Sequence, residues 1–172
     1  MLLTAIAERA EMRGWISVNV TDRDGMLSEI IVQLRQKASH ILAPETNSWL
    51  SEIHVHGVGF TRTREEVPST WRADMTKAVS ELNEKDAGLL ITVDEASAQS
   101  DELPVLIDSF QHFVRERRDV ALLLAGLPHN VSTLIDVDAI SFLRRAFKHT
   151  MDQISATDTS YAIKETVEGA GR

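Results

Sequence analysis

The sequence contains no cysteine, which excludes disulfide bonds, thiolate metal sites and cysteine nucleophiles. Long apolar runs are also missing: none approaches the roughly 20 residues that a membrane-spanning helix needs, and the N-terminus has no signal-peptide pattern. Basic residues are few, with 18 Lys and Arg against 26 Asp and Glu and a formal net charge of −8. Nucleic acid is therefore not indicated as a partner, nor is a membrane surface. Together these absences predict a cytoplasmic protein.

The residues that are present suit a single domain with a sizeable core. Of the 172 residues, 43% are hydrophobic and 26% are charged, which is ordinary for a globular protein and argues against wholesale disorder. Residue periodicity predicts helices over 2–13, 25–42, 131–135, 139–147 and 158–169, with two more capped by Ser69 or Thr70 and by Ser100 or Asp101. It predicts strands over 15–20, 53–60, 88–93, 120–125 and 151–154.

The order of these elements predicts the fold class. Strands that alternate with amphipathic helices favour a mostly parallel sheet covered on both sides, which is a three-layer αβα sandwich. The segments 88–93 (GLLITV) and 120–125 (VALLLA) are almost continuously apolar, as expected for strands buried on both faces. Ligands of such sheets bind beyond the carboxyl ends of the strands. Candidate site residues should therefore follow these two segments.

An acidic pair, Asp94 and Glu95, directly follows the apolar run GLLITV. Carboxylates at the edge of a buried strand are costly to desolvate without a partner, and a divalent cation with a nucleotide phosphate is one such partner. We expect Asp94 to hold Mg²⁺ through water and Glu95 to orient and polarise an attacking water. The alternative is that both residues simply begin a solvated loop.

Three further residues are candidates because of where they lie along the chain. His129 follows Pro128 just after the segment VALLLA, where it would approach a phosphate; a plain loop histidine is the alternative. Arg144 and Arg145 lie in a later helical stretch, where one of them would reach a phosphate as an arginine finger. A solvated helix end explains the same two arginines.

Taken in order, the segments GLLITVDEAS, VALLLAGLP and SFLRRAFKHTMDQIS resemble the Walker B, sensor-1 and following regions of bacterial and archaeal ATPases of the AAA/STAND type. The resemblance covers most of the chain and is strongest between residues 87 and 155. It implies a P-loop NTPase core, ATP and Mg²⁺ as cofactors of the parent protein, and catalytic, metal and nucleotide roles for the residues named above. Residues 43–68 match least well.

The phosphate-binding loop of that family, GxxxxGK[ST], is absent. The sequence has eight glycines, and none is followed by lysine. The start of the chain, MLLTAIAERAEMRGWISVNV, resembles the helix and strand that follow the loop. The resemblance thus implies that residues 1–172 form one partial ATPase domain, an incomplete core without its first strand, phosphate loop or helical lid. We expect ATP binding by this chain to be weak or nil, since backbone N–H groups of the loop supply most of the phosphate binding.

A partial domain has consequences for its partners. The loss of a central strand exposes two inner strand edges unless they close up, which predicts either a homodimer through those edges or a rearranged fold. The remainder of its own ATPase chain is the second expected partner.

Two other classes of protein compete with the ATPase hypothesis. The first is a non-enzymatic α/β interaction domain, in which the acidic pair is only a loop. The second is a receiver-like phosphoacceptor domain, whose required layout of acidic residues and lysine the sequence does not show. A metal pair at His54 and His56, which share one face of the predicted strand 53–60, has no third ligand nearby in the sequence.

Overall fold

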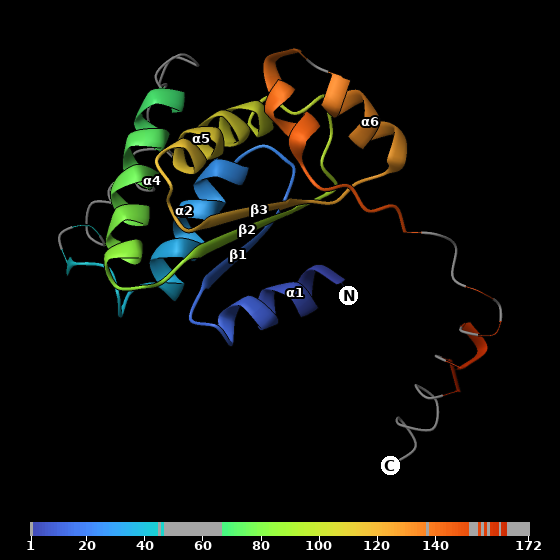
Figure 1. Cartoon of the computed structure of the whole chain (residues 1–172), viewed down its shortest axis with the longest axis horizontal. Helices are drawn as coiled ribbons and strands as arrows, with labels where there is room; N and C mark the ends of the chain where they lie inside the picture. Colours follow the sequence, from blue (N-terminus) through green and yellow to red (C-terminus); the bar gives the residue numbers. More distant parts are fainter. Residues whose placement is uncertain are drawn as a thin grey trace.

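The chain folds as a mixed α/β domain around a three-stranded parallel sheet in the order β1-β2-β3 (Figure 1). This computed structural model describes residues 2–44, 46, 67–136, 138–151, 155, 157, 159–161 and 163–164. The strands are β1 (Ile16–Thr21), β2 (Leu89–Asp94) and β3 (Val120–Leu124). Val18 pairs with Ile91, which pairs in turn with Leu122. The parallel sheet that the alternating elements predict is therefore confirmed.

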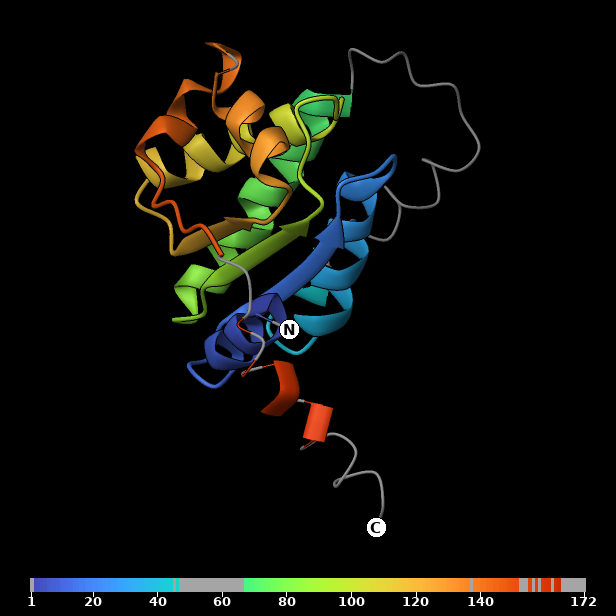
Figure 2. The same cartoon turned by 90° about the vertical axis from the view of Figure 1, so that its right-hand side faces the viewer.

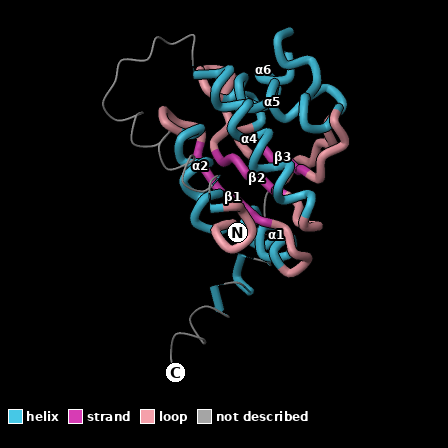
Figure 3. The backbone as a smooth tube through the Cα atoms, turned by 90° about the vertical axis from the view of Figure 1, so that its left-hand side faces the viewer, coloured by secondary structure: helices cyan, strands magenta, loops and turns pink. Residues whose placement is uncertain are grey.

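Helices lie on both faces of the sheet, so the predicted layering is present. Figure 1 shows α1 (Leu2–Glu11) on one face and α2 (Met26–Lys37), α4 (Val67–Glu84) and α5 (Leu103–Arg115) on the other. The two perpendicular views show the same separation (Figures 2 and 3). The helix α6 (Pro128–Asp136) and the 3-10 helix η1 (Asp138–Arg145) follow β3 and pack against each other.

The core lies between the sheet and the layer of α2, α4 and α5. Alternate residues of β1 and β2 enter it, with Val18 and Val93 completely buried. Trp71 of α4 is also buried, and its Nε1–H donates to the carbonyl of Leu27 in α2 at 3.0 Å. Burial of a tryptophan with its polar N–H satisfied gives Trp71 a packing role between α4 and α2.

On the opposite face, α1 is attached to the sheet by polar contacts. The hydroxyl of Ser17 on β1 donates to the carboxylate of Glu11, and Lys37 forms an ion pair with the same carboxylate at 3.3 Å. The hydrogen bond from Ser17 lowers the pKa of Glu11, partly opposed by desolvation, and Lys37 lowers it further. The end of α1 is thus held against β1.

Several predicted boundaries differ from those observed. The helix expected over 25–42 ends at Lys37, and the helix expected from Ser69 or Thr70 begins earlier, at Val67. The helical stretch expected over 139–147 forms a 3-10 helix over Asp138–Arg145. The predicted strand 53–60, with His54 and His56, lies outside the described residues, as do residues 152–154 of the last predicted strand.

The prediction that β3 is buried on both faces is wrong. All five residues of β3 are only half-buried, whereas Leu89 to Val93 of β2 are buried. The physical reason is position in the sheet, since β2 has a strand on each side and β3 has one on only one side among the described residues. None of the described helices is both long enough and apolar enough to cross a membrane.

Candidate functional site

The acidic pair lies at the carboxyl end of the central strand, as the sequence predicts. Asp94 is the last residue of β2 and is half-buried, and Glu95 is exposed just beyond it. The Oδ1 atom of Asp94 accepts a hydrogen bond from the backbone N–H of Glu95 at 2.9 Å. One carboxylate therefore orders the backbone that carries the other.

The turn after Asp94 is bonded to both neighbouring strand ends. The N–H of Ala96 donates to the carbonyl of Ala125 after β3 at 2.8 Å. The N–H of Ser97 donates to Oδ2 of Asp22 after β1 at 2.9 Å. Glu95 therefore stands on a turn that is held in place from two sides.

The backbone of Glu95 adopts a left-handed conformation, with φ of 58°. Asp86 and Arg117 have similar values, but each follows the end of a helix, where this conformation is common. Glu95 follows a buried strand, so no helix end accounts for its conformation. A non-glycine residue held there costs on the order of 1 kcal/mol, and such strain is found preferentially at functional sites.

The strained backbone of Glu95 leads us to a prediction about stability. Replacement of Glu95 by glycine should raise the free energy of unfolding by about 0.5 kcal/mol, because glycine adopts positive φ without a Cβ clash. Replacement by alanine should leave it unchanged, because alanine keeps the strain. Urea unfolding of the two variants measures the difference, and equal stabilities would contradict the argument from strain.

A glycine allows the end of β3 to approach the acidic turn. A Cβ atom on Gly126 would lie 2.7 Å from the carbonyl oxygen of Ala96, well inside van der Waals contact. The chain then enters α6, with Pro128 first and His129 second. His129 is exposed, and among the described residues no hydrogen bond or ion pair joins it to Asp94 or Glu95. Its contact with phosphate stays a prediction.

The structure places the two candidate arginines on η1. Arg144 and Arg145 are both exposed, and Nε of Arg144 donates to the carbonyl of Ile135 in α6 at 3.4 Å. Apolar contacts hold η1 in place, with Leu143 buried and the ring of Phe142 6.1 Å from that of Phe110 in α5. The arginine-finger role also stays a prediction.

A cavity of about 230 Å³ lies beside the acidic turn, between the segments that follow β1 and β2. It is lined by Asp22, Arg23, Asp24, Ser97, Gln99, Ser100, Asp101 and Glu102. Four carboxylates and one arginine make its lining acidic, which does not suit a phosphate. In the part of the chain that the structure describes, no group of three or more acidic or histidine side chains is arranged to hold a metal ion.

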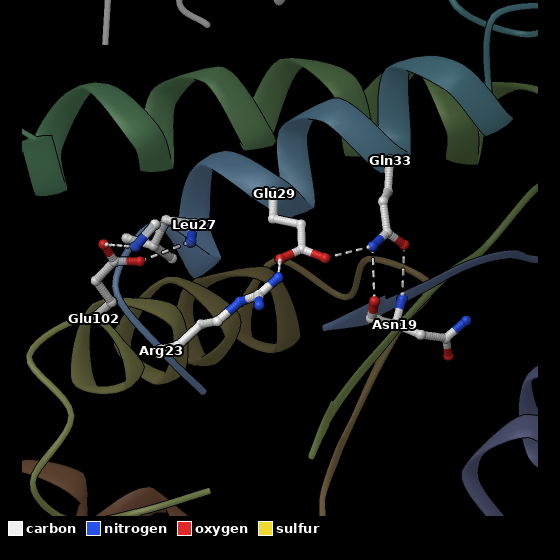
Figure 4. A network of polar contacts seen from close by, with 7 residues as sticks. Asn19, Arg23, Leu27, Glu29, Gln33 and Glu102 are labelled. Carbon is white, nitrogen blue, oxygen red and sulfur yellow. Dashed lines mark hydrogen bonds and ion pairs between the residues drawn. The ribbon is translucent and has the colours of Figure 1, made fainter. Parts of the chain in front are cut away.

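Glu102 is a positioning residue that the sequence analysis missed. Its carboxylate accepts hydrogen bonds from the backbone N–H of Gly25 at 2.9 Å and from that of Leu27 at 2.8 Å (Figure 4). These amides begin α2, and Gly25 at its N-cap has no side chain to satisfy them. The signal in the sequence that was missed for Glu102 was a helix start with glycine where a capping side chain is usual.

Ser100, one of the two predicted caps of α5, does accept a hydrogen bond from the backbone N–H of Leu103 at 3.0 Å.

Comparison of the chain with protein-family models, with curated proteins and with solved structures finds no match.

Proposed function

We propose that this chain is part of a P-loop ATPase of the AAA/STAND type and contributes its acidic strand and the strand next to it. The observation that carries the proposal is Glu95 held in a strained conformation at the carboxyl end of the central strand. Strained backbone conformations cluster at functional sites, and no helix end accounts for the one at Glu95, which supports a role for this residue.

Asp94 and Glu95 have separate roles in this proposal. Carboxylate oxygens are the ligands that Mg²⁺ prefers, and one or two suffice because the ion keeps several waters. Asp94 would hold the ion through water, and the exposed Glu95 would orient the water that attacks the terminal phosphate. The bound ion would neutralise charge that develops on the phosphate oxygens.

The residues around the acidic pair fit bound Mg²⁺-ATP only in part. Gly126 approaches Ala96 closely, and α6, with Pro128 first and His129 second, follows it in the chain. The backbone N–H groups and lysine of a phosphate loop are not supplied, because the sequence has no GxxxxGK[ST] motif. ATP binding by the 172-residue chain is therefore expected to be weak or nil.

A non-enzymatic interaction domain is the second candidate. It is favoured by a groove of about 640 Å³ between α1 and the sheet, lined by apolar side chains with Arg9 and Arg13 among them. A groove of this kind suits another polypeptide as well as a ligand. If the chain is an interaction domain, Asp94 and Glu95 only form part of a surface turn and have no catalytic role.

Calorimetric titration with Mg²⁺-ATP tests the ATPase proposal. We expect no measurable binding by the chain and micromolar binding by a version that starts about 60 residues further upstream in the gene, the length that a strand and a phosphate loop need. In that version Glu95→Gln should keep binding and lower hydrolysis by about 10²–10⁴-fold.

Glu84→Gln, at the exposed end of α4, is the matched control and should leave hydrolysis unchanged. Absence of binding by both versions would reject the proposal and leave the interaction domain. Equal hydrolysis by the Glu95 and Glu84 variants would reject the role of Glu95.

A further inference from the structure

The two outer edges of the described sheet differ. At the β1 edge, the side-chain amide of Gln33 on α2 replaces a neighbouring strand: its Nε2 donates to the carbonyl of Asn19 at 2.7 Å, and its Oε1 accepts from the N–H of Asn19 at 3.1 Å (Figure 4). Glu29 holds Gln33 in place by accepting from Nε2 at 3.1 Å. The N–H and the carbonyl of Asn19, which face away from β2 at the middle of β1, are thus already bonded. Gln33 therefore blocks the middle of this edge to another strand.

The β3 edge has no such cover among the described residues. The N–H of Ala125 donates to Val93, and the carbonyl of Asp119 accepts from Leu89, so these odd-numbered residues point their amides at β2. Because amide direction alternates along a strand, Leu122 and Leu124 direct theirs away from β2. In the described part of the chain no strand pairs with that side. Among the residues that the structure describes, this edge is a row of unpaired amides on an uncharged strand.

We propose that β3 pairs with β3 of a second copy of this chain, in antiparallel register about Leu123. The residues 121–125 read Ala-Leu-Leu-Leu-Ala, which is the same in both directions. Antiparallel pairing about Leu123 therefore sets Leu122 against Leu124 of the second copy and each alanine against an alanine. Leu122 and Leu124 are the residues with outward amides, so the two pairs exchange four N–H···O bonds. Sequence symmetry and amide direction agree on one register.

The geometry gives a closed dimer. Only one edge of each described sheet is open, and a two-fold axis uses both open edges at once, so growth stops at two copies. The axis is perpendicular to the six-stranded sheet, so both α1 helices lie on one face. Ala121 and Leu123 point to that face, where Ala121 lines the apolar groove beside Leu90 and Ile6. The two grooves then join across the axis.

The area of this interface limits its strength. A stable complex buries about 800 Å² per partner, and a pair of five-residue strands alone buries less. The groove and Leu127, 61% exposed just past β3, must supply the rest. The net charge of −8 on each copy opposes association. We therefore expect a dissociation constant of about 1–100 μM. The inference concerns the 172-residue chain, because a strand supplied from upstream, as the ATPase proposal requires, would compete for the same β3 edge.

Sedimentation velocity over about 1–300 μM, with cysteine cross-linking, tests the dimer. Since the chain has no cysteine, a single Leu123→Cys variant carries one thiol. Leu123 faces its own copy in a pair without hydrogen bonds, where Cα atoms lie about 4.5 Å apart, within the range of a disulfide. Ala121→Cys is the matched control, because its own copy lies four residues along the strand, about 13 Å away. We expect oxidation to cross-link the Leu123 variant at least tenfold more than the control.

A charge pair checks the register independently. Leu123→Glu and Leu123→Lys should each sediment as monomers, and an equal mixture should dimerise, because opposite charges then meet across the axis. If these variants do not fold, as circular dichroism will show, the cysteine pair decides alone. A wild-type monomer throughout the concentration range, equal cross-linking at positions 121 and 123, or wild-type species larger than a dimer would overturn the proposal.

Discussion

Replacing Phe113 by alanine is expected to lower the free energy of unfolding by about 3–5 kcal/mol. Phe113 belongs to α5 and is only 2% exposed in the core between the sheet and the helices. Removal of its ring loses the transfer free energy of the buried atoms and leaves a cavity that the surrounding side chains fill only in part. For a domain whose total stability is about 5–15 kcal/mol, this is a large fraction.

Phe147 provides the matched control. It has the same side chain but is 93% exposed, so Phe147→Ala should change stability by less than about 0.5 kcal/mol. Urea unfolding followed by circular dichroism measures both, at a protein concentration of about 0.5 μM so that dimerisation adds nothing. If the two variants were equally stable, the placement of α5 against the sheet would be wrong.

The second large effect is expected at Glu102. Its carboxylate bonds the N–H groups of Gly25 and Leu27, across 77 and 75 residues of sequence. Glu102→Ala removes both acceptors, and the bond to Leu27, a buried residue, is the harder one for water to replace. We expect a loss of about 2 kcal/mol, below the sum for two charged bonds, because water reaches the exposed Gly25.

Amide hydrogen exchange separates this effect from a general loss of stability. In Glu102→Ala, exchange at Gly25 and Leu27 should accelerate more than exchange in β2, because the start of α2 opens locally. Glu102→Gln keeps one acceptor oxygen and should lose about half as much stability. Glu84→Ala, at the exposed end of α4, should be neutral. Uniform acceleration throughout the chain would contradict a local role for Glu102.

The elements with strong local patterns were predicted well. The strand β2 and the helix α5 appear within one or two residues of their expected positions. Continuous apolarity and helical periodicity are properties of a few neighbouring residues, so no distant contact is needed to read them. The placement of Asp94 and Glu95 at a strand end follows from the same local pattern. Ends of helices were predicted less well: α2 ends at Lys37, although Ala38, Ile41 and Leu42 beyond it still pack in or against the core, so the apolar periodicity continues past the helix.

The functional roles proposed for the site depend on contacts that no local pattern contains. The conformation of Glu95 depends on a turn bonded to the ends of both neighbouring strands. His129 and Arg144 were proposed from order along the chain, and their positions relative to a phosphate stay predictions. The strand β3 has the composition of a buried strand, yet it is half-exposed.

The sequence by itself determined the α/β class, the parallel sheet and the acidic pair at the end of its central strand. Only the tertiary structure decided which edge of the sheet is blocked and which is open. It also decided which carboxylate accepts the hydrogen bonds of the first amides of α2. The physical reason is that hydrophobic periodicity acts between near neighbours, whereas strand order and the bonds of Gln33 to Asn19 and of Glu102 to Gly25 join residues 14 to 77 positions apart. Such pairs form only after the chain has packed, when buried or edge amides need partners.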